Sequence, residues 1–275
     1  HDALPISLNH SLSADEITEI TGILNGTTNY ILSKMSDEGL DFDSVLKDAQ
    51  EKGYAERHPE ADVEGYDACR KIAILTSLAF GKQVDFEDIY TEGITKITDK
   101  DIKYAKAMNK SIKLLGTSCK ADGKVYAMVC PMMIGQNHPL YSVKDVFNAI
   151  FVNGNMVDDL MFYGRGAGKL PTASAVTADV VEAARNLGNT LPILWSQDKL
   201  ELASTGEFKH QFFVRMKEET SREEIEKAFG KVSYVTLEDV KGEVAFVTPL
   251  MKEKEYQQKI KAFETVISMI RMNAK

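Results

Sequence analysis

The chain has 275 residues, of which 44% are hydrophobic and 27% charged, values typical of a globular protein of one to three domains. Its net charge of -8 and pI near 5.3 argue against a broad surface for nucleic acid or anionic membranes, which would need a basic field. No apolar run approaches the ~20 residues of a membrane-spanning helix. We therefore expect neither nucleic acid nor a membrane as partner. Three cysteines without metal-type spacing favour a reduced, cytoplasmic protein.

Residues 1–7 read HDALPIS and form a separate segment. They lack the charged and apolar regions of a signal peptide, and they resemble the translation of a sequencing-library adaptor. We interpret them as a leader foreign to the protein. The native chain is then expected to extend further toward its N-terminus.

The segment that follows is expected to be helical. Ser13 is a suitable N-cap, Asp15 and Glu16 would lie in the first turn, and the isoleucines that follow form an apolar stripe. The stripe meets Asn25-Gly26-Thr27-Thr28, where a glycine inside a helix costs about 1 kcal/mol. Two explanations are open at this point: another backbone packs closely onto Gly26, or a ligand approaches it.

A stretch rich in carboxylates runs from Gly53 to Lys71, with the sequence GYAERHPEADVEGYDACRK. Glu56 and Asp62 lie in a loop that the proline at position 59 keeps from becoming helix. Asp67 and Lys71 stand four residues apart and share one face of a helix that should run to about residue 80, before a glycine. Taken alone, they could be a surface ion pair worth about 0.3–0.5 kcal/mol. The loop lacks the Asp-x-Asp-x-Asp-Gly order of a calcium site, and we expect no metal there.

Beyond a helix that starts after Thr98, the apolar period changes from that of helices to that of strands. The turn signal at 119–124 separates two apolar runs, and strands are expected at 125–129, 149–152 and 160–163. We infer an α+β layer, in which helices cover one face of a mainly antiparallel sheet.

The glycine-rich segment Gly164-Arg165-Gly166-Ala167-Gly168 follows a strand and precedes a helix over 172–185, so its backbone amides could hold a phosphate. A dinucleotide-binding unit would continue into a parallel strand with an acidic residue about 20 positions on. No such strand follows here. On the residues alone, a structural turn is favoured over a phosphate contact.

The C-terminal part has a different order of predicted strands and helices. Residues 187–206 are irregular and suggest a linker. Beyond them the pattern is strand, helix, strand, strand, helix, strand, which is the ferredoxin-like order βαββαβ. This part carries no nucleophile, base or metal cluster. We expect it to bind a small molecule or another subunit.

Three motifs, in this order, resemble homoserine dehydrogenase: GILNGTTNYILSKM, GYAE followed by EADVEGYDACRK, and MFYGRGAGKLPTASAV. The likeness covers most of residues 8–185. The C-terminal part resembles the ACT domain that is appended to many members of the family. The resemblance implies a substrate-binding, catalytic and dimerisation domain over 8–190, a linker over 191–206 and an ACT-like regulatory domain over 207–275.

The resemblance implies an NAD(P)-dependent oxidoreductase that interconverts L-homoserine and L-aspartate 4-semialdehyde in threonine, methionine and isoleucine biosynthesis. Carried over by position, it makes Lys71 the catalytic residue that moves the hydroxyl proton, and Glu56 and Asp67 the substrate-binding carboxylates. Asp62 matches an acidic position with a supporting role, and Tyr54 is expected beside the substrate. The assignment is chemically sound, because carboxylates hold an ammonium group and hydride transfer at an alcohol carbon needs a proton carrier.

The resemblance also implies substrate contacts from Asn25, Gly26 and Thr27, and nucleotide contacts from Gly168 and its neighbour Gly166. For the complete protein it implies NADP or NAD as cofactor, a homodimer or homotetramer, and a place for a monovalent cation. The ribose-discriminating residues would lie upstream, so the choice of nucleotide stays open.

Two departures from the family pattern modify these expectations. The family's nucleotide-binding domain would lie before residue 1, so we expect this chain alone to be inactive. The first loop of the ACT-like part reads MKEETSREEIEKAF, without the family's proline and glycine, which argues against threonine as an effector. The alternative function is a non-catalytic dimerisation scaffold with an amino-acid-binding ACT module.

Overall fold

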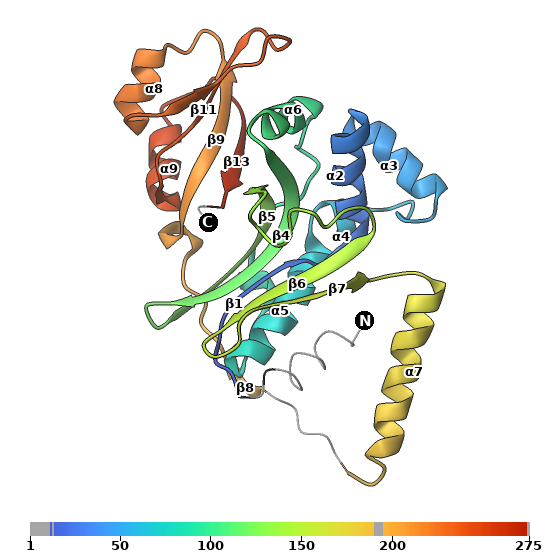
Figure 1. The fold of residues 1–275 in the computed structure, drawn as a ribbon. Coiled ribbons are helices and arrows are strands. Elements are labelled where there is room, and N and C mark those ends of the chain that lie inside the picture. The colour runs from blue at the N-terminus through green and yellow to red at the C-terminus, as the bar shows by residue number, and fades with distance from the viewer. Residues whose placement is uncertain (1–11, 13, 190–194, 274–275) are drawn as a thin grey trace.

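The computed structural model describes residues 12, 14–189 and 195–273, and its fold is α+β (Figure 1). The first elements are β1 (Ile17–Ile23), α2 (Gly26–Glu38), α3 (Phe42–Glu51), α4 (Glu60–Val63), α5 (Tyr66–Phe80), β2 (Lys82–Gln83), β3 (Tyr90–Thr91), α6 (Asp99–Ala107), β4 (Lys110–Ala121), β5 (Lys124–Gly135), β6 (Phe147–Gly154), β7 (Asp158–Arg165) and α7 (Lys169–Arg185). They are followed by β8 (Ser196–Lys199), β9 (Lys209–Lys217), α8 (Arg222–Phe229), β10 (Ser233–Val235), β11 (Glu243–Val247), β12 (Met251–Lys252), α9 (Glu253–Ile260) and β13 (Val266–Met272).

One sheet of 11 strands crosses the described part of the chain, with the main order β10-β11-β9-β13-β5-β4-β1-β6-β7. Its neighbours along this path are antiparallel except β13 and β5, which are parallel. The short strand β12 pairs with β9, and β3 pairs with β5. The expected fold class, a mainly antiparallel sheet with helices, is confirmed.

Alternation along the strands builds two apolar layers, one on each face of the sheet. In β4, Leu114 belongs to the larger core and its neighbour Leu115 to the smaller one. The larger core also contains Ile31 from α2 and Ile72 from α5, so these helices cover one face. The smaller core includes Leu140 from the loop before β6. Because successive side chains of a strand point to opposite faces, the central strands are buried on both sides.

Ser13, the expected N-cap, lies outside the described residues. The helix expected after it is wrong, because residues 17–23 form β1, which lies between β4 and β6. Ile20 packs in the larger apolar core and Ile23 in the smaller one. Because apolar residues face both cores, the segment lacks the alternation of apolar and polar residues by which half-buried strands are recognised. Its threonines and isoleucines are β-branched, which suits a strand. Asn25 then caps the start of α2, and Gly26 is its first residue rather than an interior one.

The other helices agree more closely with the sequence pattern. The helix α5 runs from Tyr66 to Phe80 and ends at Gly81, whose φ of 72° is the left-handed conformation that favours glycine. The helix α6 begins after Thr98, which forms a capping box with Asp101. These ends are confirmed.

The C-terminal part contains the elements of the expected βαββαβ order, with the two-residue strand β12 added before α9. Its four main strands pair in the order β10-β11-β9-β13. A separate apolar cluster fills the space between these strands and the helices α8 and α9, with Phe212, Ile225 and Phe246 completely buried. The sheet nevertheless continues into the rest of the molecule through β13, where Arg271 pairs with Met132 of β5.

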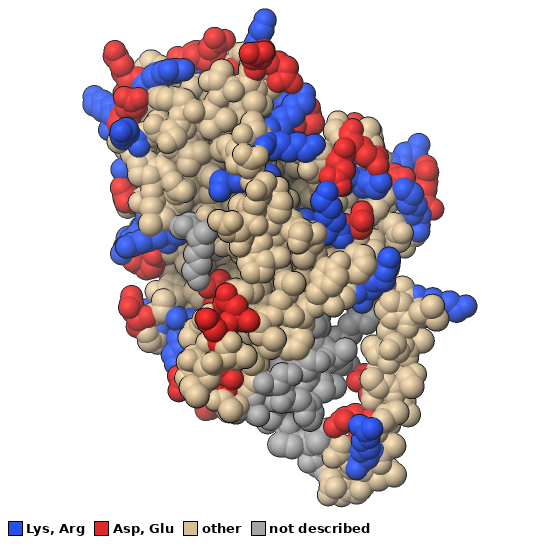
Figure 2. All heavy atoms as spheres, viewed as in Figure 1, with Lys and Arg blue, Asp and Glu red and all other residues tan. Residues whose placement is uncertain are grey.

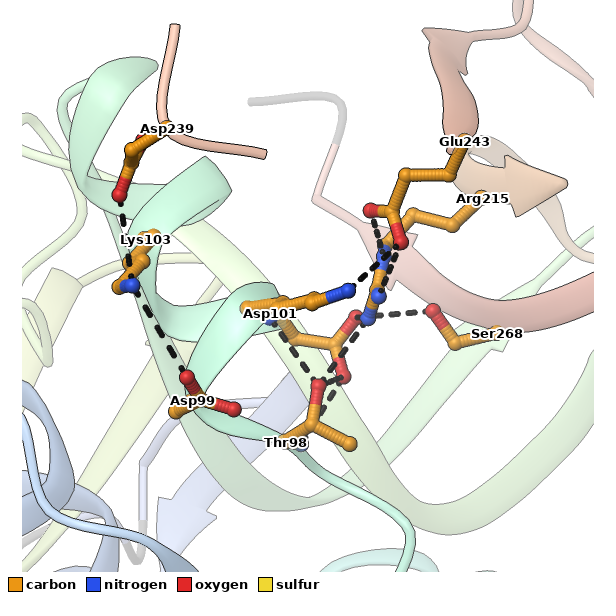
Figure 3. A network of polar contacts seen from close by, with 9 residues as sticks. Thr98, Asp99, Asp101, Lys103, Arg215, Asp239, Glu243 and Ser268 are labelled. Atoms are coloured by element: carbon orange, nitrogen blue, oxygen red, sulfur yellow. Dashed lines mark hydrogen bonds and ion pairs between the residues drawn. The ribbon is translucent and has the colours of Figure 1, made fainter. Parts of the chain in front are cut away.

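Buried ion pairs reinforce this junction (Figure 3). Arg215 of β9 lies 2.8 Å from Asp101 of α6 and 2.8 Å from Glu243 of β11. Ser268 of β13 donates a hydrogen bond to the same Asp101 carboxylate. On the other side of the junction, Arg271 bonds Glu92 at 2.6 Å. The C-terminal part is therefore tied to α6 and to the segment after β3.

The linker expected before the C-terminal part is not wholly irregular. Residues 196–199 form β8, which pairs with β2 in a separate sheet of two strands. Trp195 donates from Nε1 to the side chain of Gln83 at 2.8 Å. Trp195 and Gln83 are 112 positions apart, so the local pattern could not indicate this contact.

The helix α7 stands apart from the sheet in Figure 1, and none of its residues is buried. Several of its apolar side chains are exposed, among them Leu170 at 78% and Val180 at 62%. In the face drawn in Figure 2, acidic and basic side chains are interspersed, and α7 is mostly uncharged. No helix of the described residues is long and apolar enough to cross a membrane.

Candidate active site

Asp67 and Lys71 lie on the first two turns of α5, on the same face. The Lys71 ammonium lies 2.6 Å from Asp67 Oδ2 and donates a second hydrogen bond, of 3.0 Å, to the carbonyl oxygen of Leu24. The two side chains are 38% and 31% exposed, so a small ligand can reach both. The contact forms as the spacing predicts, and its catalytic role stays a prediction.

Asn25, the N-cap of α2, joins the two parts of the carboxylate stretch. Its Nδ2 donates hydrogen bonds to Asp62 Oδ1 at 2.7 Å and to Asp67 Oδ2 at 2.9 Å. Its Oδ1 accepts from the backbone N–H of Thr28 at 2.9 Å. Both ends of this buried amide are therefore engaged. Asn25 thus links the two carboxylates, and its expected contact with the substrate stays a prediction.

Asp62 is half-buried beside this amide. Burial raises the pKa of the Asp62 carboxyl, the hydrogen bond from Asn25 opposes that rise, and the nearby Asp67 charge adds to it. Two carboxylates that share one amide donor repel each other. A bound cation, such as a substrate ammonium group, would relieve that repulsion.

Gly26 and Thr27 begin the helix α2 next to these carboxylates. Thr27 donates from its hydroxyl to the carbonyl oxygen of Tyr54 at 2.7 Å, which fixes the loop after α3. The ring of Tyr54 is 43% exposed and packs edge-on against Tyr30. A Cβ atom added to Gly26 would lie 2.9 Å from the carbonyl oxygen of Val146, so close backbone packing does occur there. Close packing of another backbone, the first explanation for this glycine, is therefore found in the structure. A ligand contact stays a prediction.

Glu56 follows the buried residue Ala55 in the loop before α4 and is exposed. Gln50 donates to its backbone carbonyl at 3.0 Å, which holds the loop. Within the described ranges, the Glu56 carboxylate forms no ion pair or hydrogen bond. It is therefore available to a cation brought by a ligand.

The glycine loop, Gly164–Gly168, joins β7 to α7. Gly168 has a φ of 118°, which side chains rarely adopt, and a Cβ atom added at Gly166 would lie 2.1 Å from the side-chain nitrogen of Asn148. The loop is a structural turn with glycine required at two positions. Its expected contact with a nucleotide stays a prediction.

The structure thus brings Asn25, Asp62, Asp67 and Lys71 into one hydrogen-bonded group. Thr27 and Tyr54 contact each other, whereas Glu56 contacts none of the predicted site residues through its carboxylate within the described ranges. The sequence pattern did not indicate the Leu24 carbonyl or Asn148 as part of this site. The Leu24 carbonyl is a backbone atom, and Asn148 is a single amide within a strand, so neither has a sequence signal. In the part of the chain that the structure describes, no cluster of His, Cys, Asp and Glu could hold a metal ion.

Comparisons with known proteins indicate the family of the chain. A family model described as homoserine dehydrogenase matches residues 5–181. A homoserine dehydrogenase of Mycobacterium tuberculosis is 46% identical over 223 residues, which make up 78% of this chain and 51% of that protein. The chain spans about half the length of the curated relatives it matches.

Solved structures show the same likeness. The chain matches a homoserine dehydrogenase from Thiobacillus denitrificans with a TM-score of 0.86 and 31% identity, over 98% of this chain and 67% of that one. It matches a hyperthermophilic archaeal homoserine dehydrogenase mutant in complex with NADPH with a TM-score of 0.56 and 28% identity, over 68% of this chain and 53% of that one. Because the family model matches well over half of its residues, the chain belongs to the homoserine dehydrogenase family.

Proposed function

We propose that the chain is the substrate-binding and catalytic part of an enzyme that interconverts L-homoserine and L-aspartate 4-semialdehyde with NADP or NAD. The observation that carries this proposal is the contact of the Lys71 ammonium with Asp67 inside a carboxylate group that Asn25 orders. Family membership supports the substrate class. Because the chain spans about half of its relatives, we infer that the complete enzyme supplies the main nucleotide-binding domain.

The carboxylates suit the ammonium group that both substrates carry. Asp67 uses Oδ2 for Lys71 and Asn25, and its Oδ1 has no hydrogen-bond partner from the described residues. Glu56 offers a second exposed carboxylate across the loop. We assign the substrate ammonium to Asp67 and Glu56, with Asp62 and Tyr54 as neighbours.

We assign the proton transfer of the reaction to Lys71. In the reducing direction the aldehyde carbon gains a hydride, and its oxygen must gain a proton to become the hydroxyl of homoserine. The Lys71 ammonium donates that proton, and in the oxidising direction its neutral amine takes the hydroxyl proton back. The Asp67 carboxylate and the Leu24 carbonyl hold Nζ in place for both directions.

A nicotinamide nucleotide would supply the hydride when bound. The glycine loop fits a close backbone approach, since Gly168 has a positive φ and Gly164 has no atom within 4 Å of its Cβ position. The archaeal relative solved with NADPH supports this class of cofactor. We assign Gly166 and Gly168 to the wall of the nucleotide site and leave the choice between NADP and NAD open.

The test is to join this chain to the upstream sequence and assay NADPH oxidation with aspartate semialdehyde. We expect turnover by the complete enzyme, none by the chain alone, and a loss of at least about 100-fold in Lys71→Ala with the fold intact by circular dichroism. A scaffold without catalysis, the alternative function, would show no activity in any of the three. Native-rate turnover by the chain alone would also overturn the inference that the complete enzyme supplies the main nucleotide-binding domain.

For the C-terminal part, 207–275, we propose an ACT-like regulatory domain after a linker at 191–206. Its βαββαβ order and a cavity of about 530 Å³, lined by Thr220, Tyr234 and Leu237 among others, support a small-molecule module. The loop from β9 to α8 lacks proline and glycine, so we do not assign threonine. Calorimetric titration with L-threonine tests this, and tight binding would contradict it.

We also propose that the complete protein is a cytoplasmic homodimer or homotetramer. The strand β7 lies at the edge of the sheet and exposes Met161 and Tyr163, which are 41% and 54% accessible. An exposed edge strand with apolar side chains is a surface on which a second copy can pair. Light scattering after size exclusion would measure the mass, and a monomer at micromolar concentration would contradict this assignment.

A further inference from the structure

Asn148, in β6, lies between the first turn of α2 and the glycine loop. A Cβ atom added to Gly166 would lie 2.1 Å from Asn148 Nδ2 and 2.8 Å from its Cγ. A Cβ atom added to Gly26 would lie 3.4 Å from Asn148 Oδ1. One amide therefore separates the substrate side of the proposed site from its nucleotide side.

The strand that carries Asn148 is held on both sides. Asn29 of α2 donates from Nδ2 to the carbonyl oxygen of Phe147 at 3.1 Å. The buried Lys113 bonds Asn29 Oδ1 at 3.2 Å, which fixes that amide in turn. On the other side, the pairing of β6 with β7 sets Asn148 opposite Gly164. Because its backbone is anchored in this way, the Asn148 side chain can act as a rigid spacer.

The carbonyl oxygen of the Asn148 side chain is buried and has no hydrogen-bond partner in the described part of the chain. A buried acceptor without a donor is costly, and in native proteins such a group calls for an explanation. The glycine loop lies against this amide and carries backbone N–H donors. The geometry therefore indicates a hydrogen bond that is made in another state of the loop.

We propose that Asn148 is a positioning residue that sets the spacing between Asn25–Thr27 and the glycine loop. Its Oδ1 accepts a backbone N–H of the glycine loop when a nicotinamide nucleotide settles against that loop. This inference rests on the proposed function. Hydride transfer needs the two reacting carbons in close and directed contact, and a displacement of about 1 Å slows such a step by roughly 100-fold. Asn148 acts through the loop and touches neither carbon.

Two glycines give a matched test of the spacing in the complete enzyme. Gly166→Ala should lower kcat by roughly 100-fold, because its Cβ displaces the loop from Asn148. The control is Gly135→Ala at the end of β5, outside the proposed site, where the nearest atom to an added Cβ is Lys110 Nζ at 3.6 Å, and it should stay within about threefold of wild type. The double variant Asn148→Ala/Gly166→Ala should be no worse than Asn148→Ala. A double variant that loses the product of the two single effects would overturn the spacer role.

Asn148→Leu tests the acceptor, because leucine keeps the width of the side chain and lacks the oxygen. In fluorescence titrations without substrate, its Kd for NADPH should rise about tenfold, the effect of one hydrogen bond. The KM for homoserine and the thermal midpoint should stay near wild type, which a merely structural defect would not allow. NADPH should slow amide exchange of Gly166 and Ala167 in wild type more than in this variant. Unchanged NADPH affinity in Asn148→Leu would overturn the acceptor role.

Failure of this inference is distinct from failure of the proposed function. If the complete protein shows no turnover, the proposed function is wrong. Amide exchange in the glycine loop of the complete protein, measured with and without NADPH, still decides whether Asn148 accepts from that loop. Protection of Gly166 and Ala167 by NADPH that is present in wild type and lost in Asn148→Leu supports the contact, and equal protection in the two proteins overturns it.

Discussion

Removing the Arg215 guanidinium, as in Arg215→Met, should destabilise the protein strongly because two buried carboxylates lose their guanidinium partner. Glu243 would keep only Lys100, at 3.4 Å. Arg215 lies 2.8 Å from Asp101 and 2.8 Å from Glu243, and none of the three side chains is more than 3% exposed (Figure 3). Removing one partner of a buried pair costs about 3–5 kcal/mol. Total stabilities are about 5–15 kcal/mol. We therefore expect the variant to lose a large part of the free energy of unfolding at pH 7.

Urea unfolding followed by circular dichroism measures this loss. The matched control is Lys103→Met, which removes a pair with Asp239 of 3.3 Å between side chains that are 48% and 64% exposed. An exposed pair contributes at most about 1 kcal/mol. Equal losses in Arg215→Met and Lys103→Met would refute the reasoning that burial determines the cost.

The difference in stability between wild type and Arg215→Met should also change with pH in a definite direction. Burial raises the pKa of Glu243, but the hydrogen bonds and charge of Arg215 outweigh it and hold that pKa below its ordinary value of 4.5. A lowered pKa stabilises the fold above the ordinary value, and this stabilisation is lost as the pH falls through the folded-state pKa. The difference between wild type and Arg215→Met should therefore shrink below pH 4.5. A difference that grows there would contradict the assignment.

Two further predictions concern buried polar groups. His210 is 7% exposed, and burial lowers its pKa from 6.5 to about 4. Stability should fall as the pH drops from 6.5 toward 4, because the unfolded chain takes up the proton first, and thermal unfolding of His210→Phe should show a flatter slope. Asn25→Ala removes the N-cap of α2 and should cost about 1–2 kcal/mol in urea unfolding. Asn25→Asp keeps the cap acceptor but adds a carboxylate beside Asp62 and Asp67. Its loss of stability should therefore diminish at acid pH, where the carboxylates are protonated. A loss of stability that is independent of pH would count against the bridging role of Asn25.

The sequence pattern predicts those helices whose ends carry a local signal. The helix α5 has a long apolar run and a terminal glycine, and α6 has the threonine cap at its start. Both kinds of signal act over a few residues, so they are visible in a single chain. The segment 17–23 shows the opposite case, because its helix-like spacing of isoleucines arises from burial on two faces of a sheet.

The candidate active site likewise contains one contact that the local sequence predicts and others that only the tertiary structure forms. Asp67 and Lys71 are four residues apart, so the helix alone brings them together. The amide of Asn25 reaches Asp62 and Asp67 from 37 and 42 positions away, and only packing of β1 and α2 against α5 makes that contact. The role of Asn148 depends on two backbones that approach each other, which no residue pattern records.

Short-range physics therefore determined much of this protein from its sequence: the caps of α5 and α6, the βαββαβ order of the C-terminal part and the pairing of Asp67 with Lys71. The order of the motifs was enough to indicate the homoserine dehydrogenase family. The tertiary structure alone decided that β1 is a strand, that one sheet joins both parts of the chain and that Arg215 is buried with Asp101. Such contacts link residues far apart in the chain, 114 positions in the case of Arg215 and Asp101. Their energy comes from burial, which exists only once the chain has folded.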